Sequence, residues 1–256
     1  MAGMGGDGRD TRAGSLAAAG DRPRTGLRAM VVEDETELAG LLGSYLERDG
    51  FEVAVVHDGL EAVEAAHAVD PDVVVLDLGL PRLDGVEVCR RLRTFSDAYV
   101  VMLTARSEEV DTLIGLSVGA DDYLTKPFSP RVLMARIQAM LPRPRPLAAS
   151  ADALDGARTF GGLVIDPLGR DVWLDGEPVA LTRTEFDLLA ALSERPRMAF
   201  SRRQLIDTVW GPTWFGDEHL VDVHIGHLRR KLDDDAARAR FIRTVRGVGY
   251  RMGTGQ

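Results

Sequence analysis

Apolar and polar residues follow two rhythms along the chain, and together they predict a layered α/β domain over residues 27–141. Short strand patterns with many apolar residues occur at 27–32, 51–56, 72–77 and 98–104, and DDYLTK at 121–126 predicts a further, short strand. Between these patterns, apolar residues recur every three or four positions. This spacing predicts helices before Gly50, at 59–69, 85–94 and 108–118, and from Ser129 to about Leu141. Five strand–helix repeats predict a parallel sheet covered on both faces.

After residue 157 the predicted strands and helices follow one another in a different order. Two strand patterns, FGGLVID and DVWLDG, precede three helix signals. The first two helices begin with the spacing of a capping box, Thr182 with Glu185 and Ser201 with Gln204. The third, over 218–232, carries an apolar stripe. The final segment FIRTVRGVGYRM has two strand-like halves around its glycines, which predicts a hairpin and an α+β domain.

Composition predicts the domain boundaries. Residues 1–26 are rich in Gly, Ala and Arg without periodicity, as in a disordered tail. The first domain spans 27–141 and the second 158–253. The segment between them, 142–157, begins PRPRPLAASADALDG and has the composition of a linker.

Bulk properties restrict the class of protein. The 256 residues are 45% hydrophobic and 28% charged, as in a soluble globular chain. We expect no membrane span, no signal peptide and a cytoplasmic location. Cys89, the only cysteine, excludes a disulfide framework, and we interpret it as a partly buried thiol. The segment 27–143 holds 21 acids and 11 bases, whereas 158–256 holds 14 and 15, which suggests two different tasks.

Polar residues follow four of the predicted parallel strands. Glu33–Glu35 follow the first strand, Asp77 ends the third, Thr104 ends the fourth and Lys126 follows the fifth. Each alone could be an ordinary residue at the start of a loop. However, the carboxyl ends of parallel strands meet at one edge, where open sheets bind ligands. We therefore expect these side chains to form one site.

The chemistry of this set indicates an aspartyl-phosphate site. Crowded carboxylates repel one another unless a cation lies between them, and hard oxygen ligands favour Mg²⁺. A carboxylate beside Mg²⁺ is a candidate nucleophile toward phosphorus. Asp77 is the best nucleophile because it ends the central strand. Lys126 and Thr104 can then pair with the phosphoryl group.

Particular motifs resemble a known family. The stretches VVEDE, VVVLDLGLPRLDG, VVMLTAR and GADDYLTKPFSP resemble the receiver domain of two-component response regulators. VDVHIGHLRRKL and TVRGVGYR resemble the winged-helix output domain of the OmpR/PhoB subfamily. The resemblance covers about 27–252. It implies a flavodoxin-like (βα)5 receiver with a doubly wound parallel sheet, joined to an α+β winged helix-turn-helix domain.

The resemblance assigns roles within the receiver. Glu33 and Asp34 would hold Mg²⁺, and Asp77 would both ligate the metal and accept phosphate. The Gly79 carbonyl would be a further ligand, and the Lys126–Pro127 bond would be cis. Thr104 and Tyr123 resemble the family's switch pair, although a strand-end Thr and a core Tyr remain alternatives. We interpret Asp84 as a turn residue and Glu35 as a helix cap.

The third helix of the second domain is the candidate DNA reader. Its outward face would lie in the major groove, with Arg246 on a wing at the hairpin tip. His224 resembles a phosphate contact of the family. A solvated helix face and a structural histidine remain alternatives, because the domain is nearly neutral. The predicted contacts are Asp222, Val223, His224, His227, Arg229, Arg230 and Arg246.

The resemblance also implies partners. A cognate histidine kinase would donate the phosphoryl group, and a phosphorylated homodimer would bind tandem half-sites on double-stranded DNA, with RNA polymerase as a candidate further partner. Asp122 with Arg136 and Asp121 with Arg143 match two ion pairs of the family's dimer interface. Thr112 and Val132 replace the third pair, and Gly226 and His227 stand where the family often has arginines.

Two other functions compete with that of a phosphorylation-controlled transcription factor. A phosphatase or phosphotransferase would use Asp77 on small molecules, but Gly79 stands where such phosphatases have a second Asp. A receiver that has lost its phosphorylation would leave a constitutive DNA-binding protein, but the intact acid, Thr and Lys set argues against it. The favoured interpretation is a regulator that is not an enzyme.

Overall fold

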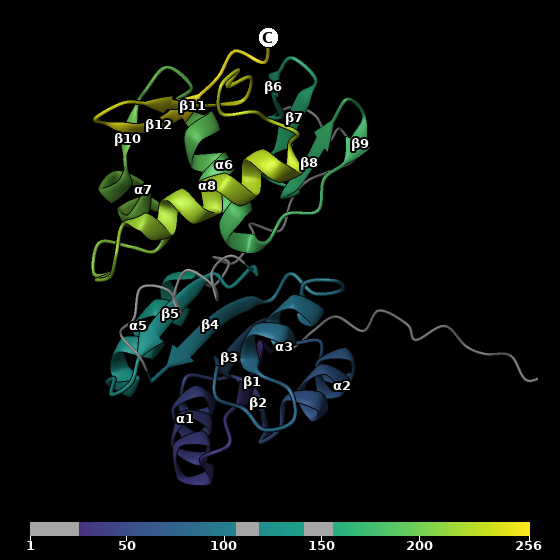
Figure 1. Cartoon of the computed structure of the whole chain (residues 1–256), viewed down its shortest axis with the longest axis vertical. Coiled ribbons are helices and arrows are strands. Elements are labelled where there is room, and N and C mark those ends of the chain that lie inside the picture. Colours follow the sequence, from purple (N-terminus) through teal and green to yellow (C-terminus); the bar gives the residue numbers. More distant parts are fainter. Residues whose placement is uncertain (1–25, 106–117, 141–155) are drawn as a thin grey trace, which may run out of the picture.

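The computed structural model describes residues 26–105, 118–140 and 156–256, which form two domains (Figure 1). The predicted tail (1–26), helix 108–118 and linker (142–157) lie wholly or almost wholly outside the described residues. The proposed domain boundaries therefore stay predictions.

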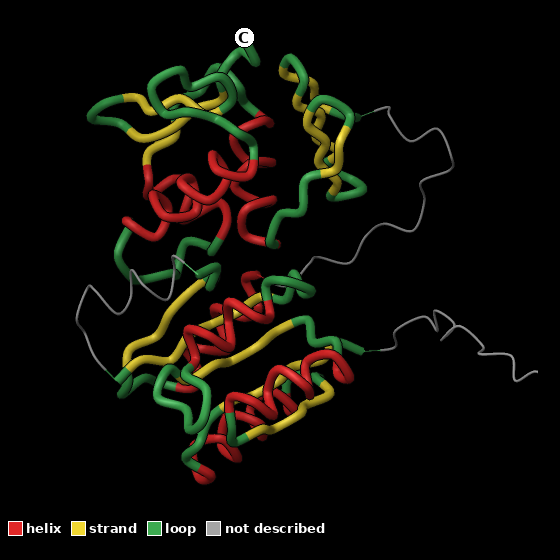
Figure 2. Tube along the Cα trace, turned by 45° about the vertical axis from the view of Figure 1, so that its right-hand side comes forward, coloured by secondary structure: helices red, strands yellow, loops and turns green. Residues whose placement is uncertain are grey.

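The first domain is a five-stranded parallel sheet with helices on its faces (Figure 2). Its strands have the order β2-β1-β3-β4-β5, and every residue of β3 and β4 is buried. Right-handed crossovers place α1 beside α5 on one face and α2 beside α3 on the other. The strands are β1 Arg28–Val32, β2 Glu52–Val56, β3 Val73–Asp77, β4 Tyr99–Thr104 and β5 Asp122–Thr125. The helices are α1 Thr36–Arg48, α2 Gly59–Val69, α3 Gly85–Leu92 and α5 Pro130–Met140.

These bounds confirm the five predicted strands, and the predicted helices other than 108–118, to within two residues. Local details correct three interpretations. Asp84 is the N-cap of α3, where its side chain accepts a hydrogen bond from the Glu87 amide, rather than a simple turn residue. Glu35 holds the N-cap position of α1, but its side chain makes no capping bond. Cys89 is fully buried, and this burial raises the pKa of its thiol to about 11.

The second domain combines two antiparallel sheets with three helices. A four-stranded sheet, β6-β7-β8-β9, precedes the helices, and a three-stranded sheet, β10-β12-β11, ends in the predicted hairpin. The capping boxes at Thr182 and Ser201 are both present. Strands β6, β9 and β10 have only two or three residues, too few to show a period in the sequence. The strands are β6 Arg158–Phe160, β7 Leu163–Asp166, β8 Asp171–Leu174, β9 Glu177–Pro178, β10 Phe200–Ser201, β11 Ile242–Val245 and β12 Gly249–Met252. The helices are α6 Arg183–Glu194, α7 Arg202–Val209 and α8 His219–Lys231.

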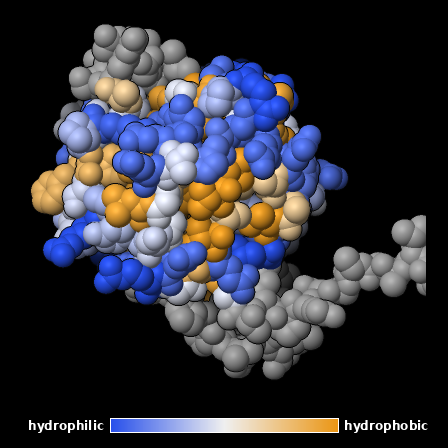
Figure 3. All heavy atoms as spheres, turned by 90° about the horizontal axis from the view of Figure 1, so that it is seen from below, coloured by the Kyte–Doolittle hydropathy of each residue, from blue (hydrophilic) through white to orange (hydrophobic). Residues whose placement is uncertain are grey.

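The two domains pack against each other, and the contact lies at the amino-terminal ends of the receiver-like strands. Trp210 and His224 of the second domain both reach the Asp121 carbonyl, just before β5. Arg183 pairs with Asp72, just before β3, at 3.0 Å. The carboxyl edge of the sheet therefore points away from the second domain. Figure 3 shows the molecule from the side of the first domain, where hydrophilic side chains surround a hydrophobic middle. No helix among the described residues is long and apolar enough to cross a membrane.

Candidate functional site

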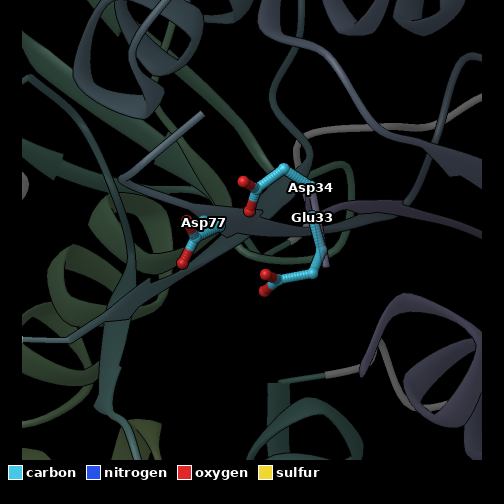
Figure 4. Close-up of side chains that lie close together, drawn as sticks. All are labelled: Glu33, Asp34 and Asp77. Atoms are coloured by element: carbon cyan, nitrogen blue, oxygen red, sulfur yellow. The ribbon is translucent and has the colours of Figure 1, made fainter. Parts of the chain in front are cut away.

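Three carboxylates meet at the carboxyl edge of the sheet, as the sequence predicted (Figure 4). Glu33 and Asp34 follow β1, and Asp77 ends the neighbouring strand β3. One oxygen from each carboxylate lies within 4.8 Å of the other two. Glu33 and Asp77 are buried, whereas Asp34 is exposed and leaves the cluster open to solvent.

Lys126 binds two of these carboxylates from the end of β5. Its Nζ lies 2.7 Å from Oδ1 of Asp77 and 2.8 Å from Oε2 of Glu33. Burial opposes the ammonium charge, but the hydrogen bonds to Asp77 and Glu33 outweigh it and raise the pKa of Lys126. Burial also raises the pKa of Glu33. The Lys126–Pro127 peptide bond is cis, as the resemblance implied.

The donor set of this cluster fits Mg²⁺. Three carboxylates face one ammonium, so a divalent cation would balance the remaining charge. All of the candidate side-chain ligands are hard oxygens, and His57 directs its Nδ1 to the Glu33 backbone carbonyl (2.8 Å) instead of the carboxylates. The Gly79 amide donates to Oδ2 of Asp77 at 2.8 Å, which orients the candidate nucleophile.

Thr104 lies on β4, the strand next to that of Asp77, and Tyr123 lies on β5, one strand farther out. Thr104 ends β4 and is 2% exposed, next to Leu103, the register partner of Asp77. Tyr123 lies on β5 and is only half-buried. Its hydroxyl accepts a hydrogen bond from the Asp217 amide of the second domain, at 3.4 Å. Tyr123 is therefore a surface residue at the domain contact rather than a plain core aromatic.

Comparison with known proteins identifies both domains. Residues 29–138 match the model of the response regulator receiver domain, and residues 176–252 match that of the C-terminal domain of transcriptional regulatory proteins. The transcriptional regulatory protein CseB of Streptomyces avermitilis is 45% identical over 230 residues, 87% of this chain and 93% of that protein. The chain belongs to the two-component response regulators of the OmpR/PhoB subfamily. This family consists of DNA-binding transcriptional regulators and not of enzymes.

Other relatives match this response regulator over both domains. The DNA-binding response regulator MtrA of Mycobacterium tuberculosis is 42% identical over 226 residues, 88% of this chain and 96% of that protein. The solved structure of a mutant of the protein RitR superposes with a TM-score of 0.68 at 30% identity, covering 90% of this chain and 100% of that one. A receiver domain and a DNA-binding domain imply a kinase partner and a DNA partner for this regulator.

Helix α8, the candidate reader of DNA, contacts the receiver. His224 is 1% exposed and His227 is 6% exposed, so the prediction that His227 points outward is wrong for this arrangement. Nε2 of His224 lies 3.2 Å from the Asp121 carbonyl oxygen of the receiver. Two of the predicted DNA contacts are therefore inaccessible while the domains stay packed.

The remaining predicted contacts on the output domain differ in their accessibility. Asp222 binds Arg202 and the Tyr250 hydroxyl, each at 2.7 Å, and Arg229 reaches the Ile242 carbonyl of the wing hairpin. Val223 is partly buried. Arg230 and Arg246 are exposed, the latter at the tip between β11 and β12, as predicted.

Three of the residues predicted to join two receivers have ion-pair partners within this chain. Asp122 pairs with Arg136 at 2.8 Å, and both are buried. Asp121 pairs with Arg93. The fourth predicted residue, Arg143, lies outside the described residues, as does Thr112. The role of these residues in a dimer is not tested by these contacts and stays a prediction.

Sequence reasoning missed the aromatic residues that hold the two domains together. Trp210 and Trp214 follow α7 and are 1% and 2% exposed, and their indole nitrogens donate to the Asp121 carbonyl and the Asp122 carboxylate. The Arg136 guanidinium lies over the Trp214 ring and donates to the Phe215 carbonyl. The signal was a stretch with two tryptophans and a phenylalanine, WGPTWF, which begins at the last residue of the second predicted helix of this domain.

Proposed function

We propose that a cognate histidine kinase phosphorylates Asp77 with the help of Mg²⁺, and that this releases α8 to bind DNA and regulate transcription. The observation that carries the proposal is the convergence of Glu33, Asp34, Asp77 and Lys126 at one open edge of the sheet. No other group of three potential metal-binding side chains occurs among the described residues.

Each side chain of this cluster has a chemical role in the proposal. Glu33, Asp34 and Asp77, with the Gly79 carbonyl, would hold Mg²⁺, which neutralises phosphoryl oxygens when it is bound. An oxygen of Asp77 attacks the phosphorus of the kinase's phosphorylated histidine, the phosphorus–nitrogen bond breaks and the kinase imidazole leaves. The Gly79 amide keeps the Asp77 carboxylate oriented. Lys126 already lies 2.7 Å from Asp77, so its ammonium can pair with the new phosphoryl group. The Thr104 hydroxyl would donate a hydrogen bond to the same group.

The arrangement in which the output domain packs on the receiver is called the closed form below. It supports phosphorylation as the switch. Asp77 lies at the carboxyl edge of the sheet and the output domain packs at the amino edge, so the signal must cross the sheet. Tyr123 lies between the two. Its register partner on β4 is Met102, two residues before Thr104, and its hydroxyl accepts a hydrogen bond from the Asp217 amide. An inward turn of the Tyr123 ring would remove this contact with the output domain.

Release of the output domain would also free the surface proposed for dimerisation. Asp121, Asp122 and Arg136 now contact or adjoin Trp210, Trp214 and Phe215, so the closed form and a receiver dimer would compete for them. Together with Arg143, these residues would form the interface of the dimer. We expect the dimer to act in the cytoplasm. The dimer would place two copies of α8 on tandem half-sites, where RNA polymerase is a candidate further partner.

Chemical labelling tests this function directly. Incubation with acetyl phosphate and Mg²⁺ should add one phosphate to the intact mass, and Asp77→Asn should remain unlabelled. The labelled protein should bind a duplex selected from a random DNA pool more tightly than the unlabelled protein. Full labelling of Asp77→Asn would refute the assignment of the acceptor. Equal DNA affinity before and after labelling would instead favour a constitutive DNA-binding protein.

A further inference from the structure

Two histidines on α8 form a buried pair at the boundary between the domains. His224 and His227 are one turn apart, with ring centroids separated by 6.1 Å and planes nearly perpendicular. His224 also lies against the Trp210 ring, at 5.6 Å. A cavity of about 540 Å³ beside His227 is lined by residues of both domains, including Gly119 and Lys231. His224 therefore lies directly against the receiver, and His227 lies beside a cavity that both domains line.

The contacts of His224 suit only its neutral form. Its Nε2 lies 3.2 Å from the Asp121 carbonyl oxygen, so Nε2 carries the ring proton and donates it. Its Nδ1 is buried and has no hydrogen-bond partner within the described part of the chain. A second proton would therefore lie on Nδ1 as a buried, unpaired donor, which is costly.

The Glu185 carboxylate lies near His227 but already pairs with Lys231. Nδ1 of His227 is 3.7 Å from Oε1 of Glu185, beyond hydrogen-bond distance. The other oxygen of Glu185 already accepts from Lys231 at 2.7 Å and from the Thr182 amide at 2.8 Å.

The remaining charged groups around the pair are also paired or repulsive. Asp121 just before β5 and Asp122 on β5 face His224, and each already has a guanidinium partner, Arg93 and Arg136 respectively. Arg230 and Lys231 on α8 repel a positive charge on His227, as does a protonated His224. The surrounding groups therefore do little to stabilise the positive charge of a protonated imidazole, which would remain buried in the closed form.

We propose that the His224–His227 pair makes the closed form sensitive to acid, so that protonation of the pair releases α8 from the receiver without phosphorylation. Opening would give both imidazoles access to water, where the charged form is stable. The proposal deepens the proposed function by adding a second input to the same closed form, and it concerns a domain contact that can be measured without DNA or phosphate.

The direction of the pH effect follows from the burial of the pair. Burial lowers the pKa of both histidines in the closed form, that of His227 to about 4. Exposed histidine titrates near 6.5, so the open form binds more protons in this range. The stability of the closed form is complete above pH 6.5 and falls as the pH drops from 6.5 toward 4. At pH 5.5, His227 alone shifts the equilibrium about tenfold toward the open form.

Neighbouring carboxyl groups act in the opposite sense. Burial raises the pKa of Asp122 and Asp187, so the closed form takes up protons there more readily than the open form does. Opening in acid therefore requires that the two histidines outweigh these carboxyl groups. We expect acid opening between pH 6.5, the ordinary pKa of an exposed imidazole, and pH 5.

Tryptophan fluorescence measures this opening in the full-length protein. Asp77→Asn prevents phosphorylation, and Trp173→Phe leaves only Trp210 and Trp214, both buried at the domain contact. Their emission should shift to longer wavelength between pH 6.5 and 5, while the radius of gyration from small-angle X-ray scattering increases. Circular dichroism should stay constant over this range, which separates opening from unfolding.

Three variants assign the effect to the pair. His224→Gln with His227→Gln cannot be protonated and should lack the acid shift. His227→Arg carries a permanent charge and should be open already at pH 7.5. His219→Gln, at the exposed start of α8, is the matched control and should keep the shift of the parent protein.

The proposal is overturned if the parent protein stays closed down to pH 5, if the double glutamine variant keeps the full shift, or if His227→Arg is closed at pH 7.5. A double variant already open at pH 7.5 has no acid shift left, and the parent and His227→Arg then decide. Failure of acid opening leaves the labelling of Asp77 untouched, and failure of labelling leaves the acid result untouched.

Discussion

The indole nitrogen of Trp214 lies 3.2 Å from Oδ2 of Asp122 and donates to it across the boundary between the output domain and the receiver. The same carboxylate binds Arg136 on the receiver, and it is fully buried. A single carboxylate is thus held by groups from both domains. Opening of the molecule removes the donor from the output domain and exposes the carboxylate to water.

Trp214→Phe should weaken the closed form, because it removes this hydrogen bond while keeping an aromatic ring. A hydrogen bond to a charged group contributes about 1.5–3 kcal/mol, so the unphosphorylated protein should bind DNA at least about tenfold more tightly. Fluorescence anisotropy with a labelled duplex measures the change. Trp173→Phe, on β8, is the matched control. Unchanged DNA affinity in Trp214→Phe would show that this bond does not restrain α8.

Arg136→Ala should destabilise the folded protein strongly, because it leaves Asp122 as a buried carboxylate without its cation. Breaking one side of a buried pair costs about 3–5 kcal/mol. Urea denaturation measures the loss, and adding Asp122→Asn should restore a large part of it. If the second substitution restores nothing, the loss arises from the contacts of Arg136 with Trp214 and Phe215.

Glu33→Gln should stabilise the protein at pH 7 without Mg²⁺ and abolish its response to the metal. Burial raises the pKa of Glu33, so the folded state binds its proton more tightly than the unfolded state does. The ionised carboxylate therefore reduces stability at neutral pH, and this loss disappears as the pH falls through the raised pKa toward 4.5.

Thermal denaturation with and without Mg²⁺ checks this expectation. The variant should exceed the wild type by on the order of 1 kcal/mol at pH 7, or a few degrees in Tm, and the difference should vanish in acid. Mg²⁺ should raise the Tm of the wild type only. Glu37→Gln, on the exposed first turn of α1, is the control. A variant that Mg²⁺ stabilises as much as the wild type would remove Glu33 from the metal site.

Arg246→Ala should weaken binding to all DNA sequences alike. Arg246 is exposed at the hairpin tip, where a guanidinium can neutralise a phosphate in the manner of a wing. Loss of one such contact lowers the slope of log affinity against log salt by about one unit. Titrations at several salt concentrations measure this slope for the phosphorylated protein. Arg90→Ala, on the receiver helix α3, should leave it unchanged.

The sequence alone determined the elements and the acidic site, because both depend on short-range patterns. Strand β3 is a run of apolar residues that ends in Asp77, and parallel pairing with β1 brings Glu33 and Asp34 beside it. The capping boxes at Thr182 and Ser201 are likewise local, since each joins residues three positions apart. These features depend on local sequence, and not on how the two domains pack against each other.

Only the tertiary structure decided what covers α8. The apolar stripe of this helix shows which side packs into its own domain, and helical spacing then assigned His227 to the solvent side. That side faces a second domain, and the contact of His224 with Asp121 joins residues 103 positions apart. Likewise, the charges of Asp122 and Arg136 predict a pair but not whether one chain or two supply it. Packing over such distances depends on the shapes of whole surfaces, which a local pattern does not contain.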